Sequence, residues 1–138
     1  LRLIDLWLAR YAEPSAAAHA AVAGLKPMTV VTGGSRGIGL ALARRFATAG
    51  HDIALVARHA DALQAAATML ARERHVTALA IPLDVTDAAA AQRIDAHLAA
   101  NGFYLDTLIN CAGVGLAGPF LSHGEDAIQR LLDVNVEP

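Results

Sequence analysis

The chain has one cysteine, Cys111, few aromatic residues and no excess of either charge. A single cysteine excludes an intrachain disulfide and is typical of a reducing, cytoplasmic compartment. The 11 basic and 13 acidic residues give a formal net charge of −2, and no basic tract is interleaved with aromatics, so we expect no nucleic-acid partner. No uncharged apolar run is long enough to cross a bilayer, and residues 1–8 lack the pattern of a signal peptide, so we expect no membrane partner.

Hydrophobic residues, by contrast, make up 55% of the 138 residues, and charged residues only 17%. This balance is typical of a folded, heavily buried α/β domain rather than of a disordered chain. The length suffices for one domain with a real core and is too short for two domains of ordinary size.

The most informative stretch is residues 32–39, which read Thr-Gly-Gly-Ser-Arg-Gly-Ile-Gly. A short apolar run at residues 28–31 precedes it, and residues 38–47 follow with helical periodicity. Glycines between a strand and a helix let the backbone approach a pyrophosphate, while the N–H groups and positive dipole end of the helix face the anion. The stretch predicts the phosphate-holding turn of a dinucleotide site; the simpler alternative is a tight turn and nothing more.

The spacing of these glycines, Gly33-x3-Gly37-x-Gly39, narrows the class of site. No lysine follows Gly37 or Gly39, as one does in the phosphate loop of nucleotide triphosphatases. With Thr32 in front, the stretch resembles the T-G-x-x-x-G-x-G motif of the short-chain dehydrogenase/reductase family. That resemblance implies an oxidoreductase that passes a hydride between a nicotinamide and a carbonyl or alcohol.

From residue 28 the pattern alternates between strands and helices. Strands are predicted at 28–32, 52–57, 76–82 and 105–110, and helices at 37–49, 60–74, 87–100 and 122–134. Gly50 is placed to cap the first of these helices, and Ser122 and Glu125 have the spacing of a capping box at the start of the last. The alternation predicts an α/β fold: a Rossmann-type parallel sheet of strand order 3-2-1-4 with helices on both faces.

Residues 1–27 precede this domain as a helical extension. Residues 1–13 have the pattern of an amphipathic helix, residues 15–23 that of a second, alanine-rich helix, and residues 24–27 that of a linker. The extension either packs on its own domain or contacts a partner subunit, and the sequence leaves both open. Residues 28–138 form the predicted cofactor-binding domain.

The end of the second predicted strand favours NADP(H) over NAD(H). An NAD-preferring site places an acidic residue about 20 residues beyond the glycines, at this strand end, to bind the adenosine ribose. Here Ala57 offers no acceptor, whereas Arg58 presents a planar guanidinium to a ribose 2′-phosphate, and Arg36 is placed to approach the same phosphate. Both arginines also have a simpler interpretation as solvated surface charges.

Two further segments resemble the family at strand ends. Asp84, in Leu-Asp-Val-Thr-Asp, is by this resemblance an adenine contact, and otherwise a turn or helix-cap residue. The sequence Asn-Cys-Ala-Gly that begins at Asn110 resembles the family's N-N-A-G, in which Asn110 bonds the neighbouring backbone, and Ala112 and Gly113 leave room for the ribose and nicotinamide. Cys111, the departure from that motif, is expected to be a small buried residue rather than a nucleophile.

Asn135, near the end of the chain, resembles the family asparagine that supports a water chain to the active-site lysine, a proton-relay role; composition alone makes it an ordinary helix-end residue. The predicted cofactor-binding residues are Gly33, Ser35, Arg36, Gly37, Ile38, Gly39, Arg58, Asp84, Val85, Asn110, Ala112 and Gly113. No histidine has the spacing of a metal ligand, so no metal site is predicted.

The other catalytic residues of the family, a serine and a Tyr-x-x-x-Lys motif, cannot be assigned in this sequence. Neither Tyr11 nor Tyr104 has a lysine four positions later. Since the chain starts at Leu1 and stops at Pro138, we expect the cofactor-binding half of a longer NADP(H)-dependent reductase, inactive by itself. The longer form is expected to act on a small-molecule carbonyl or alcohol as a dimer or tetramer.

Two alternatives stay open. The first is a non-catalytic NADP-binding sensor on the same fold, because fold does not fix function. The second is an interaction module in which residues 1–23 form a docking surface and the nucleotide site is vestigial.

Overall fold

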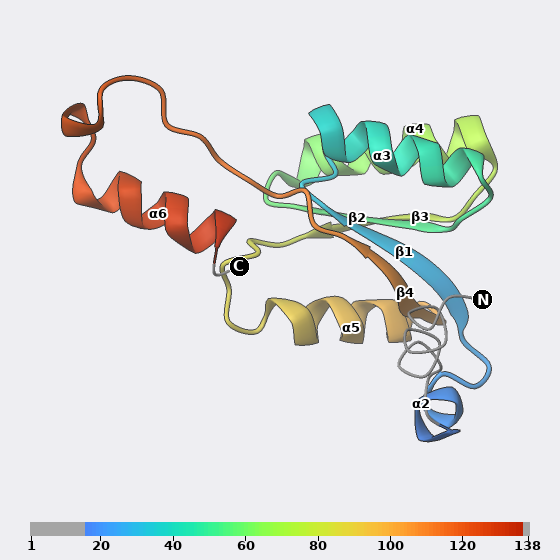
Figure 1. Ribbon diagram of the computed structural model, residues 1–138. Coiled ribbons are helices and arrows are strands. Elements are labelled where there is room, and N and C mark those ends of the chain that lie inside the picture. Colours follow the sequence, from blue (N-terminus) through green and yellow to red (C-terminus); the bar gives the residue numbers. More distant parts are fainter. Residues whose placement is uncertain (1–15, 137–138) are drawn as a thin grey trace, which may run out of the picture.

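The computed structural model describes residues 16–136, which form a parallel sheet with helices on both faces (Figure 1). In chain order its elements are α2 (Ala16–Ala21), β1 (Lys26–Thr32), α3 (Gly37–Thr48), β2 (Ile53–Ala57), α4 (Ala60–Arg74), β3 (Ala78–Pro82), α5 (Ala90–Ala100), β4 (Phe103–Ile109), the 3-10 turn η1 (Phe120–Ser122) and α6 (Glu125–Asn135). The helix predicted over residues 1–13 lies outside the described residues. Within residues 16–136, the helices are all too short or too polar to traverse a bilayer.

The strand order is β3-β2-β1-β4, and all pairs are parallel, which confirms the predicted fold. The central strand is β1, in which Val31 pairs with Leu55 of β2 on one side and Ile109 of β4 on the other. The chain moves outward from β1 to β3 and then crosses back to β4. The order therefore reverses between β1 and β4, and their carboxyl ends form the crevice where such sheets bind ligands.

Side chains of β1 alternate between two cores, one on each face of the sheet. Val30 packs with Leu98 on the side of α5, and Val31 packs with Leu63 on the side of α3 and α4 (Figure 1). All four side chains are fully buried. Burial on both faces explains why β1 is an unbroken apolar run, and it fixes the position of the glycine turn that follows.

The predicted linker at residues 24–27 is wrong in its second half, because β1 already begins at Lys26. The Lys26 N–H donates to the Gly102 carbonyl over 3.0 Å, and Lys26 is in register with Phe103 of β4. The partner strand thus extends β1 backward through Pro27, a residue that on sequence grounds marks a break.

The predicted capping box at the last helix is also wrong. α6 begins at Glu125, with Gly124 at its N-cap and no side-chain capping bond. The Ser122 hydroxyl instead donates to the Pro119 carbonyl over 2.7 Å, within the turn η1. A local bond of this kind competes with helix capping for the serine side chain.

The predicted cap of α3 is confirmed. Gly50 has a φ of +91°, and its N–H donates to the Ala47 carbonyl over 3.0 Å. A left-handed glycine directly after the last helical residues ends the helix without the strain that a side chain would add.

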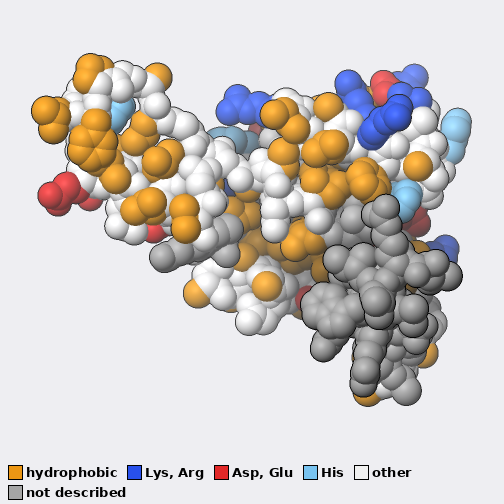
Figure 2. Space-filling model, viewed as in Figure 1, with side chains coloured by type: hydrophobic (Ala, Val, Ile, Leu, Met, Phe, Trp, Pro, Cys, Tyr) orange, Lys and Arg blue, Asp and Glu red, His pale blue; other side chains and the backbone are white. Residues whose placement is uncertain are grey.

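α6 projects from the sheet on the long connection that follows β4 (Figure 1). Apolar side chains are exposed on this projecting part and on β4, the strand at the edge of the described sheet: Leu105, Leu108, Leu116, Phe120, Leu121, Leu132 and Val136. Figure 2 shows hydrophobic atoms gathered over the projecting part.

Candidate nucleotide-binding site

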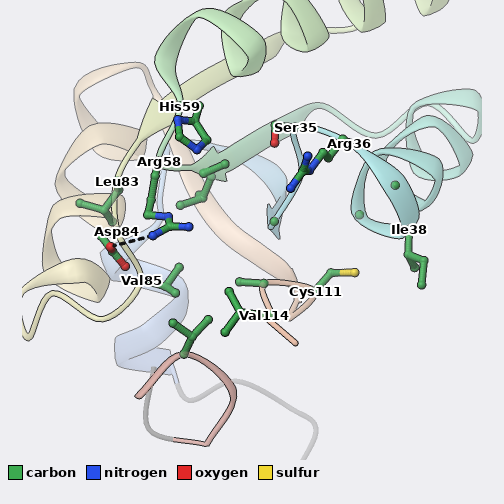
Figure 3. Close-up of a pocket in the computed structure, with 18 residues that line it drawn as sticks. Ser35, Arg36, Ile38, Arg58, His59, Leu83, Asp84, Val85, Cys111 and Val114 are labelled. Carbon is green, nitrogen blue, oxygen red and sulfur yellow. Dashed lines mark ion pairs between the residues drawn. The ribbon is translucent and has the colours of Figure 1, made fainter. Parts of the chain in front are cut away.

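A pocket of about 340 Å³ lies at the carboxyl ends of the strands, beside the point where the strand order reverses (Figure 3). Its walls come from the segments that follow β1, β2, β3 and β4, with one side chain from α6. All of the predicted cofactor-binding residues except Asn110 line it: Gly33, Ser35, Arg36, Gly37, Ile38, Gly39, Arg58, Asp84, Val85, Ala112 and Gly113. The fold thus brings together residues that are up to 80 positions apart, for example Gly33 and Gly113.

The glycine turn packs directly against the loop that follows β4. Gly33 has a φ of +66°, and a Cβ at this position would stand 2.6 Å from the Cys111 carbonyl oxygen. A Cβ on Gly39 would overlap the carbonyl of Gly33 itself. Gly37, with a φ of +59°, faces open space. Gly33 and Gly39 therefore permit close packing, and Gly33 and Gly37 permit left-handed backbone that a side chain would strain.

Thr32 connects the same two segments through its side chain. Its hydroxyl oxygen accepts hydrogen bonds from the backbone N–H groups of Cys111 (3.0 Å) and Ala112 (3.1 Å). The residue is 8% exposed, so these bonds are shielded from water. In the sequence Thr32 stands out only as part of the glycine motif, although its position at the end of a buried strand is a signal of this structural role.

The N-terminus of α3 is suited to an anion. Arg36 is the N-cap residue, with extended backbone, and its side chain makes no capping hydrogen bond. The first turn contains no acidic residue. The backbone N–H groups of that turn thus have no side-chain acceptor from the cap, and the positive end of the helix dipole stays available for a phosphate.

Cationic and polar side chains surround the mouth of the pocket. Figure 3 places Ser35 and Arg36 on one side, and Arg58 and His59 on the other. His59, the N-cap residue of α4, was not singled out from the sequence as a pocket residue, although its place directly after Arg58 was a usable signal. This group fits an anionic substituent better than a neutral hydroxyl.

Asp84 forms a turn after β3 and also faces the pocket. Its Oδ1 accepts hydrogen bonds from the Thr86 backbone N–H (3.2 Å) and the Thr86 hydroxyl (2.9 Å). Its Oδ2 lies 3.8 Å from Arg58 Nη1 and 3.5 Å from Arg130 Nη2. The structure therefore shows the turn role that the sequence allowed, together with an ion pair to the residue predicted for the 2′-phosphate (Figure 3).

These contacts set the ionisation of the Asp84 carboxyl group. Burial by itself would raise its pKa, but the two Thr86 hydrogen bonds and the charges of Arg58 and Arg130 together outweigh burial, so the pKa lies below the ordinary value. Asp84 is accordingly a carboxylate at neutral pH, and it faces two guanidinium groups.

Asn110 and Cys111 differ from expectation. Asn110 is exposed on the α5 side of the sheet, where it lines a separate cavity with Leu108 and Asn135. Among the described hydrogen bonds, the side-chain link to the neighbouring backbone is made by Thr32 and not by Asn110. Cys111 is half-buried and lines the pocket, so the expectation of a buried cysteine is wrong.

Asn135, the last residue of α6, holds the loop at Val114. Its Nδ2 donates to the Val114 carbonyl over 2.9 Å, and the Val114 N–H donates to its Oδ1 over 3.1 Å. A Cβ on Gly113 would stand 3.0 Å from the same Oδ1. Asn135 thus positions the pocket wall formed by Gly113 and Val114, which a helix-end position alone does not reveal.

Sheet order, glycine turn and pocket together define a dinucleotide-binding domain of the Rossmann type. The family model described as short chain dehydrogenase matches residues 27–138. The chain belongs to the short-chain dehydrogenase/reductase family.

Individual relatives agree with this assignment. The meso-2,3-butanediol dehydrogenase of Serratia marcescens is 32% identical over 110 residues, which are 80% of this chain and 43% of that protein. The rhamnolipids biosynthesis 3-oxoacyl-[acyl-carrier-protein] reductase of Pseudomonas aeruginosa is 33% identical over 109 residues, covering 79% of this chain and 42% of the relative. The chain spans less than half the length of these curated relatives.

Solved structures show the same fold with a bound cofactor. A short-chain dehydrogenase from Sphingobium yanoikuyae in complex with NADPH has a TM-score of 0.71 at 36% identity, covering 80% of this chain and 43% of that one. The L-sorbose reductase from Gluconobacter frateurii, complexed with NADPH and L-sorbose, has a TM-score of 0.74 at 31% identity, covering 83% and 44%.

Proposed function

We propose that residues 28–138 bind NADP(H) and form the cofactor-binding unit of an oxidoreductase that passes a hydride between the nicotinamide and a carbonyl or alcohol group. The observation that carries the proposal is the placement of Arg36 and Arg58 at one pocket mouth, at a strand end that has no acidic residue. Two guanidinium groups complement a 2′-phosphate, whereas an NAD site has a carboxylate there. The NADPH complexes of two similar structures support the same choice.

Each wall of the pocket has a proposed task. The N-terminus of α3 holds the pyrophosphate, and Arg36 and Arg58 bind the 2′-phosphate. Asp84 and Val85 contact the adenine. The small residues after β4 leave room for the ribose and nicotinamide. Asn110, which lines the neighbouring cavity and not this pocket, is proposed to contribute to cofactor binding from the end of β4. The cofactor itself supplies or accepts the hydride.

Asn135 is proposed to support a proton relay, and the proposal is compatible with the two bonds by which its side chain holds Val114. The family's serine and Tyr-x-x-x-Lys motif cannot be assigned in the 138 residues. We therefore propose that these residues by themselves do not catalyse hydride transfer. The active form is proposed to be cytoplasmic, to take a small-molecule carbonyl or alcohol, and to assemble as a dimer or tetramer.

Replacement of Arg58 by alanine tests the proposal. Charge-assisted bonds to a phosphate contribute about 1.5–3 kcal/mol, and partial exposure reduces that value, so R58A should weaken NADPH binding about tenfold. NADH binding should not change, because NADH lacks the 2′-phosphate. The control variant is Arg45→Ala, which removes an equal charge from α3 outside the pocket. An equal loss for both cofactors, or no loss, would contradict the assignment of Arg58.

A further inference from the structure

Asp84 lies between two arginines that come from distant parts of the chain. Arg58 follows β2 and faces the pocket, while Arg130 belongs to α6. Both guanidinium groups approach the same carboxylate oxygen, Oδ2, whereas the two Thr86 bonds occupy Oδ1. The two arginines therefore share a single acceptor.

The two arginines lie at different distances from the Asp84 carboxylate. The pair with Arg130 is 3.5 Å long and that with Arg58 is 3.8 Å, and neither arginine is bidentate. All three side chains are partly exposed, at 45% for Arg58, 49% for Arg130 and 36% for Asp84. Of the two arginines, Arg58 has the longer contact with the carboxylate, and it is the one that faces the pocket.

Arg130 is also the polar link between α6 and the body of the domain. Within residues 16–136, no other hydrogen bond or ion pair joins α6 to a residue that precedes β4. The same helix ends at Asn135, which holds Val114 at the pocket wall.

We propose that Arg130 is a positioning residue for the 2′-phosphate site: it compensates the charge of Asp84 when Arg58 leaves that carboxylate for the cofactor. The inference rests on the proposed NADP(H) function. The Arg58 guanidinium can bind either the Asp84 carboxylate or the 2′-phosphate of the cofactor. With Arg130 in place, the carboxylate that Arg58 leaves behind keeps a cationic partner.

Each substitution should change the preference for NADPH over NADH in a definite direction. Without Arg130, Asp84 holds Arg58 as its only cationic partner among the described residues, so releasing Arg58 to the phosphate costs more. Without the Asp84 carboxylate, no competitor holds Arg58, and Arg130 no longer matters to it. NADH has no 2′-phosphate to draw Arg58 away, so its affinity is independent of this competition.

The experiment measures the dissociation constants of NADPH and NADH for the full chain and for the variants Arg130→Met, Asp84→Asn and the double variant. The NADPH preference is the dissociation constant of NADH divided by that of NADPH. R130M should lower this preference about 1.5- to 5-fold, because exposed ion pairs contribute free energies of that size. D84N should raise the preference by a similar factor, and R130M should have no effect in the D84N background. NADPH and NADH have the same adenine, so a change in adenine binding alters both constants equally and leaves their ratio unchanged. The ratio therefore reports on the 2′-phosphate alone.

Two further variants exclude a merely structural effect. Arg130→Lys keeps the charge and should retain most of the preference. Arg93→Met breaks another exposed bridge, to Asp87, outside the pocket, and should leave the ratio unchanged.

An equal effect of R130M with and without Asp84 would overturn the inference, because it would show that Arg130 acts on the phosphate directly. If the wild-type chain prefers NADPH and R130M has the same preference, the inference about Arg130 is wrong, while the proposed NADP(H) function stands. If the wild-type chain has no preference for NADPH, the proposed function fails first.

Discussion

Thr32 and Ala112 are 80 residues apart in the chain, and the Thr32 hydroxyl accepts the Ala112 N–H over 3.1 Å. Together with the bond from Cys111, this contact fixes the glycine turn relative to the loop after β4. The two sides of the crevice are thereby held at one spacing, which a cofactor that lies across it requires.

Replacing Thr32 by valine tests that contact. Valine keeps the shape but leaves two backbone N–H groups without an acceptor in a shielded position, at a cost of about 1–3 kcal/mol of unfolding free energy. Urea denaturation of T32V measures the loss. Thr32→Ser keeps the hydroxyl and should lose less than half as much. A larger loss in T32S than in T32V would show that packing of the methyl group, which valine retains, matters more than the hydroxyl.

Alanine at Gly33 and at Gly37 should have different effects. Both positions have positive φ, so each alanine has a backbone cost of about 1–2 kcal/mol. Only at Gly33 does the new Cβ also meet backbone, 2.6 Å from the Cys111 carbonyl oxygen. G33A should therefore be clearly less stable than G37A in chemical denaturation, and the reverse order would contradict the packing described for the turn.

Acid should remove the contribution of Asp87 to stability. The Ala89 N–H first, and then Arg93, bond this carboxylate and hold its pKa below the ordinary value of 3.8. Since the folded-state pKa is the lower one, the stabilisation is complete above that ordinary value and is lost as the pH falls through the folded-state pKa. Wild type should exceed D87N in urea midpoint at pH 7, with the gap closing in acid. Asp95→Asn, on α5 like Arg93, serves as control, and a gap that persists at low pH would refute the ionic explanation.

Loss of Asn135 should loosen the pocket wall after β4. In Asn135→Ala the Val114 N–H loses its acceptor. A hydrogen bond stabilises the closed form by about 1 kcal/mol or more, so hydrogen exchange at the Val114 N–H should accelerate by about tenfold. Gln129→Ala, which removes the exposed bond to Asp133 in the same helix, is the matched control. Unchanged exchange at Val114 in N135A would mean that the loop is held by other contacts.

The sequence predicted most reliably what local chemistry determines. The strand β1, the glycine turn and α3 follow from an apolar run, residues with special backbone freedom and a helical period. They lie where predicted, except that β1 begins earlier, at Lys26. The strand order follows from alternation and crossover handedness. Boundaries failed where a local bond competed with the expected one, as in the Ser122 hydroxyl that bonds Pro119.

Contacts between distant residues were beyond the sequence. Nothing in the neighbourhood of Arg130 indicates that it meets Asp84, because that pairing depends on how α6 lies against the end of β3. The same holds for Asn135 and Val114. For Asp84 the sequence suggested a turn role and an adenine contact, and only the folded structure shows its ion pair with Arg58.

The central claim is that the pocket prefers a 2′-phosphorylated cofactor, and titration of the wild-type chain with NADPH and with NADH tests it most directly. Two guanidinium groups at the mouth, and no carboxylate in the place of Ala57, predict a dissociation constant at least about tenfold lower for NADPH. The preference should shrink as salt is added, because the arginines are partly exposed. Equal affinities, or tighter binding of NADH, would contradict the account.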